Sequence, residues 1–238
     1  MIEDINWFFN NLKNNIPFCY VRFNDGEMMG IHRAGSIAAR GDQVVDHSLQ
    51  EALVSSITHK QENYYIGVPC SVCYPDYSKL SKELIGEYNQ ITSAVLLTNK
   101  NWKSFHDNLP IAAKDRDIVW VGGHDQEPER LKEYGLKIKK TLRVPNRESW
   151  NYYKKLKTIA PEHFCDGDVV CVSLGPTARV LCQQWYEEYP KVTFIDMGSL
   201  LDPIARDVWF DAHLDRDWET HTTSPSQKCS GAIVFSFL

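Results

Sequence analysis

The chain lacks the segments that direct a protein into or across a membrane. It contains no run of about 18 uninterrupted apolar residues, and its start lacks the basic residues, apolar stretch and small-residue site of an export signal. It also lacks an excess of basic residues, since 26 Lys and Arg stand against 31 Asp and Glu, for a net charge of −5. Such a charge repels nucleic acid and anionic membranes. We therefore expect no export, no membrane span and no nucleic-acid partner.

The number and spacing of the cysteines indicate neither a disulfide framework nor a structural zinc site. The seven cysteines are an odd number, and in a chain without an export signal this favours reduced thiols. The Cys70-Ser71-Val72-Cys73 segment has no second cysteine pair at zinc-finger spacing. We find no repeat and no low-complexity tract either. The expected compartment is the cytoplasm.

The composition that remains is that of a folded enzyme-sized domain. Hydrophobic residues make up 43% of the 238 residues and charged residues 24%. This length suits one large domain better than two small ones, so we expect a single domain over residues 1–238. The tail from about residue 215, rich in Thr, Ser and His, stays unassigned.

Short apolar runs alternate with longer segments along the chain. Apolar residues at helical spacing predict a helix over residues 2–12, and the run from Phe18 to Phe23 predicts a strand ending in the turn signature Asn24-Asp25-Gly26. Further strands are predicted at 64–68, 94–97, 118–121, 169–174 and 192–196, and crossover helices at 49–59, 77–90, 127–134, 147–159 and 177–188. The pattern predicts an α/β, Rossmann-like doubly wound, mainly parallel sheet with helices on both faces.

In such sheets ligands bind beyond the carboxyl ends of the strands, so polar residues there are the first candidates. Arg22 to Glu27 ends the first predicted strand. On an extended chain Asp25 and Glu27 point the same way, and carboxylate oxygens suit Mg²⁺ or Mn²⁺ together with substrate phosphates. Arg22 suits a phosphate. The competing interpretation is an ordinary Asp-Gly turn with solvated charges.

Two later segments follow predicted strands in the same way. In the first, Gly175, Pro176 and Thr177 combine close backbone approach, a helix start and a hydroxyl near exposed amides, which is typical of an anion site. A plain strand-to-helix turn explains them equally well. In the second, Asp196 and Asp202 are expected at the same edge as Asp25, although Asp202 before Pro203 also fits a helix cap.

These segments together resemble a known family. Arg22-Phe23-Asn24-Asp25-Gly26-Glu27 is similar to the Arg-aromatic-x-Asp-Gly-Glu motif of the GT-D-type bacterial glycosyltransferases, which are Rossmann-like and carry an Asp-x-Glu metal motif. Leu174-Gly175-Pro176-Thr177-Ala178 resembles the family's Gly-Pro-Thr-Ala segment, and Ile195-Asp196-Met197-Gly198-Ser199 its closing Asp-x-Gly segment. The matches follow the family's order from residue 22 to about 203. Asn24 and Ser199 depart from it, where members often have Gly and His.

The resemblance implies a function and roles. Asp25 and Glu27 would hold the divalent cation, Mn²⁺ or Mg²⁺. Arg22 with Gly175, Pro176 and Thr177, and Gly198 and Ser199 in the closing segment, would bind a nucleoside-diphosphate sugar. The implied enzyme transfers a hexose from a UDP-sugar to a glycan or glycoprotein. If the transfer inverts the sugar's configuration, a general base is also needed, and Asp196 and Asp202 are the candidates; the sequence leaves inversion and retention both open. Serine at 199 does not act as a base unaided.

Two other classes fit a sheet of this type. One is a different nucleotide-using enzyme, such as a methyltransferase or a metal phosphohydrolase. The other is a non-catalytic domain that binds a nucleotide or a glycan. A requirement for a divalent cation argues against the methyltransferase, transfer to an acceptor other than water argues against the phosphohydrolase, and turnover itself argues against the binding domain.

Overall fold

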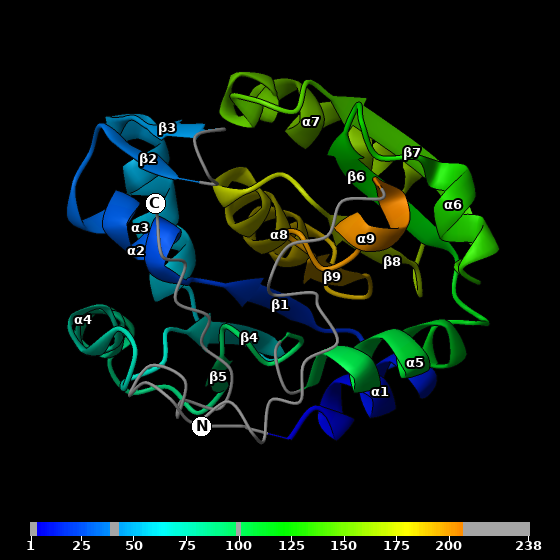
Figure 1. The fold of residues 1–238 in the computed structure, drawn as a ribbon, viewed down its shortest axis with the longest axis horizontal. Helices are drawn as coiled ribbons and strands as arrows, with labels where there is room; N and C mark the ends of the chain where they lie inside the picture. The colour runs from blue at the N-terminus through cyan, green and yellow to red at the C-terminus, as the bar shows by residue number, and fades with distance from the viewer. Residues whose placement is uncertain (1–3, 39–42, 99–100, 207–238) are drawn as a thin grey trace.

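A seven-stranded sheet runs through the centre of the protein. The computed structural model describes residues 4–38, 43–98 and 101–206, so the unassigned tail from about 215 lies outside the described part. The strand order is β5-β4-β1-β9-β8-β6-β7, and each neighbouring pair is parallel (Figure 1). The predicted Rossmann-like, mainly parallel fold is confirmed.

The elements of the described residues follow one another in βα order. The strands of the large sheet are β1 (Cys19–Arg22), β4 (Tyr64–Val68), β5 (Ile91–Ser93), β6 (Ile118–Gly123), β7 (Ile138–Val144), β8 (Val169–Val172) and β9 (Thr193–Asp196), and β2 (Ser36–Ala38) with β3 (Gln43–Val45) forms a separate antiparallel hairpin. The helices are α1 (Asn6–Lys13), α2 (Asp25–His32), α3 (His47–Thr58), α4 (Pro75–Ile85), α5 (Trp102–Ala112), α6 (Pro128–Glu133), α7 (Tyr153–Ile159), α8 (Pro176–Glu188) and α9 (Asp202–Ala205), with 3₁₀ turns η3 (Ser149–Tyr152) and η4 (Ala160–His163).

Two hydrophobic cores lie on opposite faces of the sheet. Helices α2, α3, α7 and α8 supply one core, and α1, α5, α6 and α9 supply the other. Along β8, Val170 and Val172 pack in the first core, whereas Val169 and Cys171 pack in the second. A strand buried on both faces needs apolar residues at every position, which is why the strands read as continuous apolar runs.

Neither edge strand of the sheet favours pairing with a further strand. At one edge β5 is only three residues long. At the other, β7 reads Ile-Lys-Lys-Thr-Leu-Arg-Val, with Lys139, Lys140 and Arg143 along it and most of its residues partly or fully exposed. Such a strand has no apolar run, and for that reason it was not predicted from the sequence.

Other local predictions were wrong. Residues 94–97, predicted as a strand, form turns after β5, although Ala94, Leu96 and Leu97 are buried. Asp25 and Gly26, predicted as a turn, begin the helix α2. Cys70 is disulfide-bonded, against the expectation of reduced thiols, while Cys19, Cys165, Cys171 and Cys182 are free.

No helix in the described ranges is long and apolar enough to span a bilayer.

The chain diverges where β1 and β9 lie side by side. After β1 the next strand in the large sheet is β4, on one side. After β9 the chain enters α9, which lies beside α6 on the other side, where the amide of Glu127 donates to the carbonyl of Ala205 at 2.8 Å (Figure 1). Loops that leave neighbouring strands in opposite directions leave the ends of those strands accessible to a ligand. The segments singled out in the sequence lie at this divergence.

Candidate functional site

Arg22 and Asp196 face each other at the ends of β1 and β9. The amide of Arg22 donates to Oδ2 of Asp196 at 3.1 Å, and its Nε donates to the carbonyl of Asp196 at 3.0 Å. The Asp196 side chain is fully buried, and Arg22 is only 8% exposed. Burial raises the pKa of Asp196, while the guanidinium groups of Arg179 and Arg22 act in the opposite direction. Asp196 is thus held as the counter-ion of two arginines.

The second of these arginines, Arg179, was missed in the sequence. It lies in the first turns of α8, and its Nε contacts Oδ2 of Asp196 at 3.0 Å and donates to the carbonyl of Arg22 at 2.7 Å. Its Nη1 donates to the carbonyl of Gly175, and its Nη2 pairs with Oε1 of Glu27 at 3.2 Å. An arginine among the apolar residues of the segment Ala178-Arg179-Val180-Leu181 was the available signal, because a buried arginine must have partners.

Glu27 belongs to the first turn of α2 rather than to an extended chain. Its Oε2 accepts the amide of Asn24 at 3.1 Å, completing a capping box that starts the helix. The side chain is 9% exposed. The expectation that Asp25 and Glu27 project together from an extended segment was wrong, because the capping residue draws both into the helix.

Asp25, two residues earlier, is the more open carboxylate. The hydroxyl of Tyr74, from the loop before α4, donates to its Oδ2 at 3.5 Å. Burial and then the neighbouring Glu27 raise the pKa of Asp25. A cation bound at Asp25 would remove this repulsion.

The terminal nitrogens of Arg22 remain available. Within the described residues, its Nη1 and Nη2 have no hydrogen-bond partner. The group lies over Gly198, where a Cβ atom would be 2.1 Å from Nη2. A nearly buried guanidinium with two open nitrogens is a receptor for an oxyanion. Gly198 is required because any side chain there would occupy the place of Arg22.

Gly175 and Pro176 begin α8 as predicted, but Thr177 points into the protein. Gly175 has φ +52°, a conformation that favours glycine, and Pro176 is the first residue of the helix. Thr177 is fully buried, and its hydroxyl lies 2.8 Å from that of Ser149 in η3. The backbone turn therefore lies at the site, whereas the threonine side chain joins α8 to η3.

The remaining predicted residues belong to the loop between β9 and α9. Asp202 is buried, and its Oδ1 accepts from Gln126 at 3.2 Å and contacts Nε of Arg206 at 3.4 Å. Ser199 is partly exposed. Gln126, which also donates to Ser173 at 2.7 Å, carried no recognisable sequence signal. Asp202 is thus connected to Gln126, which follows β6, and to Arg206.

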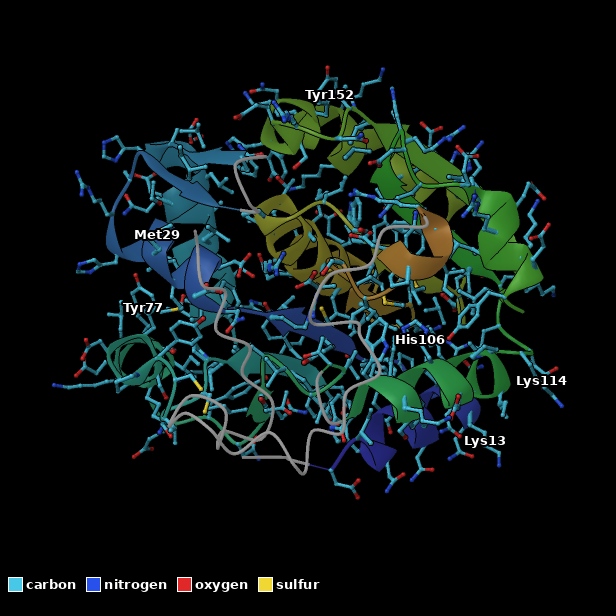
Figure 2. All side chains as sticks on the ribbon, viewed as in Figure 1. Lys13, Met29, Tyr77, His106, Lys114 and Tyr152 are labelled. Carbon is cyan, nitrogen blue, oxygen red and sulfur yellow. The ribbon has the colours of Figure 1, made fainter. Side chains whose placement is uncertain are left out.

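His106 supports the same loop from outside the site. It projects from α5 (Figure 2), and its Nε2 lies 3.1 Å from the carbonyl of Leu200. Its ring packs on Trp102, with centroids 3.8 Å apart. Burial lowers the pKa of His106 to about 4, so the ring is neutral at physiological pH and donates from Nε2.

Two surface hollows in the described part of the chain lie elsewhere. One is beside α4, lined by Ser71, Pro75, Ser78, Lys79, Lys82 and Glu83. The other is lined by Asn15, Pro17, Asp166, Gly167 and Lys191. Neither contains a predicted site residue. Neither contains a nearly buried arginine with unpartnered nitrogens, as the candidate site does with Arg22. We therefore take the carboxyl edge at β1 and β9 as the candidate site.

The donor set at this edge fits a divalent cation shared with a substrate. The described residues contain no cluster of three or more His, Cys, Asp and Glu side chains in metal-binding geometry. The first turn of α2 contains Asp25 and Glu27 and is called the acidic turn below. It offers carboxylate oxygens, the ligand type that Mg²⁺ and Mn²⁺ prefer. Because such ions are commonly held by one or two carboxylates with phosphates and water, this turn suffices when a phosphate is bound beside it.

Comparisons with known proteins agree with the architecture. No family model and no curated protein matches the sequence. Three solved structures match the fold. One, described as a new glycosyltransferase (DUF1792) from Streptococcus sanguinis, has a TM-score of 0.64 and 19% identity, over 83% of this chain and 80% of that one.

The other two are structures of the domain of unknown function 1792. One is described as showing that this domain has a distinct glycosyltransferase fold, with a TM-score of 0.63, 15% identity and coverage of 81% of this chain and 76% of that one. The second, a selenomethionine form, has a TM-score of 0.63, 16% identity and the same coverage. At these identities the likeness shows a shared fold, as the resemblance of the sequence motifs implied.

Proposed function

We propose that the protein is a glycosyltransferase that moves a hexose from a UDP-sugar to a glycan or glycoprotein acceptor. The observation that carries the proposal is Arg22, whose two open guanidinium nitrogens lie at the end of β1, the strand that leads into the acidic turn of α2. A diphosphate needs a cationic donor on one side and, through a metal ion, carboxylates on the other. The fold shared with structures described as glycosyltransferases supports this choice over other nucleotide enzymes.

In this proposal a Mn²⁺ or Mg²⁺ ion is bound at the acidic turn formed by Asp25 and Glu27. When bound there, the ion supplies Lewis-acid stabilisation of the charge that develops on the leaving diphosphate. Arg22 binds the diphosphate oxygens directly, and the Gly175 turn at the start of α8 presents backbone to them. The roles of the chain are thus to bind and orient the leaving group.

Asp196 has a supporting role in the proposal. Its carboxylate is paired with Arg22 and Arg179, so it orients Arg22 rather than accepting a proton from the acceptor. Asp202 remains the candidate base from the sequence, although Gln126 and Arg206 engage one of its oxygens. The cytoplasm remains the proposed compartment.

The test is release of nucleoside diphosphate from a panel of sugar nucleotides with Mn²⁺, Mg²⁺ or a chelator. We expect release that needs the cation and that falls at least about a hundredfold in Asp25→Asn, the scale of losing a major charge-stabilising group. Asp76→Asn is the matched control, because Asp76 is also in the first turn of a helix but is exposed on α4. It should keep the wild-type rate.

Two results would contradict the proposal. Wild-type rates in Asp25→Asn would remove the acidic turn from the reaction. No release with any donor, together with no binding of UDP in a calorimetric titration with Mn²⁺, would exclude a sugar-nucleotide enzyme. Because an absent acceptor can silence turnover but not binding, the titration decides that case.

A further inference from the structure

The two carboxylates of the acidic turn are in different situations. Both oxygens of Glu27 have protein partners, namely the amide of Asn24 at 3.1 Å and Nη2 of Arg179 at 3.2 Å. Among the described residues, Asp25 has only the long contact from Tyr74, at 3.5 Å, and local backbone amides. The sequence motif treats the two residues alike, but their surroundings do not.

Helix geometry separates them further. Residues 25 and 27 are the first and third residues of α2, and at 3.6 residues per turn their side chains leave the axis about 200° apart. Glu27 turns toward Arg179 and is buried, whereas Asp25 is partly exposed at the edge. One ion in contact with both would have to draw Glu27 out of its present position.

Moving Glu27 would leave Arg179 without a compensating charge. Arg179 is 5% exposed, and its other charged partner, Asp196, is shared with Arg22. Two buried arginines would then depend on one carboxylate. An uncompensated buried charge is strongly destabilising, so the pair formed by Glu27 and Arg179 resists opening when a cation binds.

We infer that Glu27 is the fixed counter-ion of Arg179 and that Asp25 alone, of the two, ligates the cation. This inference rests on the proposed function for the presence of the cation. Glu27 is then a positioning residue: through Arg179 it holds the carbonyls of Arg22 and Gly175, and with them the strand end and the helix start that bind the diphosphate.

The first arm of the test measures binding of Mn²⁺ by electron paramagnetic resonance, with and without UDP. Asp25→Asn and Glu27→Gln each remove one negative charge from the same turn, so the loss from charge alone is common to both. We expect the affinity of Asp25→Asn to fall at least about tenfold further than that of Glu27→Gln, because only Asp25 contributes a ligand. Glutamine preserves the capping box. Equal losses, or a larger one in Glu27→Gln, would overturn the inference.

The second arm does not depend on the proposed function. Urea unfolding of Glu27→Gln, Arg179→Met and the double variant forms a double-mutant cycle, with exposed Glu51 replaced by Gln as the control partner. We expect clearly non-additive shifts of the midpoint for Glu27 with Arg179 and additive ones for Glu51. Additive shifts for both pairs would refute the counter-ion role. If the wild-type protein binds no Mn²⁺, the cation part of the proposed function fails and this cycle alone decides the pairing.

Discussion

Gly198 has no side chain, and the guanidinium of Arg22 occupies the space that a side chain would fill. A methyl group at position 198 would lie 2.1 Å from Nη2 of Arg22, and the backbone there has φ +49°. We predict that Gly198→Ala is less stable by about 1–3 kcal/mol, from backbone strain and the displaced arginine. We also expect it to bind UDP with Mn²⁺ at least about tenfold more weakly. Calorimetry and urea unfolding measure the two effects.

Gly35→Ala is the matched control for this prediction. Gly35 also has a positive φ, +80°, but a Cβ atom there would meet no atom of the described residues within 4 Å. It should show the stability loss of the strained backbone and keep its nucleotide affinity. If Gly198→Ala kept the same affinity, the open end of Arg22 would have no part in binding.

At the residue scale the sequence predicts types of group better than their partners. Arg22, Asp196 and Gly198 were expected at one edge and are found in contact there. The link through Arg179 was not predicted, because it joins residues more than 150 positions apart in the chain. Such a partner is set by how α8 packs under β1, which no local pattern reports.

At the scale of elements, α8 separates a binding role from a structural one. Its first turn lies at the site, but the hydroxyl of Thr177 is buried 2.8 Å from that of Ser149. We predict that Thr177→Val costs about 1–2 kcal/mol of stability, since it leaves a buried hydroxyl with one partner fewer. UDP affinity should change by less than about threefold, under 1 kcal/mol. The measurements are urea unfolding and calorimetry, and a tenfold loss of affinity would return Thr177 to the binding site.

The contact between α5 and the loop before α9 should respond to pH. The pKa of His106 is about 4 in the folded protein, below the usual 6.5 of an exposed histidine. Its contribution to stability is therefore fully present above pH 6.5 and is lost as the pH falls toward 4. We predict that His106→Gln, which still donates to Leu200 but does not titrate, loses less stability than wild type between pH 7 and 4. The difference is up to about 3 kcal/mol.

Thermal unfolding at several pH values measures this difference, and exposed His124→Gln is the control. It should follow the wild-type curve. Parallel curves for wild type and His106→Gln would mean that protonating the His106 ring costs the folded protein no stability.

Whether an element was predicted depended on how its residues are buried. Strands covered on both faces, such as β6 and β8, have apolar residues throughout and were found. The charged edge strand β7 and the helix α2 were missed, the first because it lies open to solvent and the second because its start is an Asp-Gly pair typical of turns. The cap by Asn24 and Glu27 decides the second case in favour of a helix.

At the scale of the whole molecule, both cores share the same strands. Cys171 packs in one core and Cys182 in the other, and both thiols are fully or almost fully buried. Because alternate residues of β8 pack in the two cores, we predict that the two cores unfold as one unit. Thiol labelling in urea, read for each cysteine by mass spectrometry, should show Cys171 and Cys182 becoming reactive at the same midpoint.

Exposed Cys165 provides the reference, since it should label at every urea concentration. Labelling of Cys182 well before Cys171 would show that the face carrying α8 opens first, and with it the site. The single transition would then be excluded.

The two edge strands of the seven-stranded sheet, β5 and β7, disfavour pairing with a strand of another copy of the protein. Another strand adding to β7 would place a like strand against Lys139, Lys140 and Arg143, and β5 offers only three residues for pairing. Extension of the sheet from one molecule to the next is therefore unfavourable. At high concentration the seven-stranded sheet should resist growth into fibres by the addition of strands at its edges.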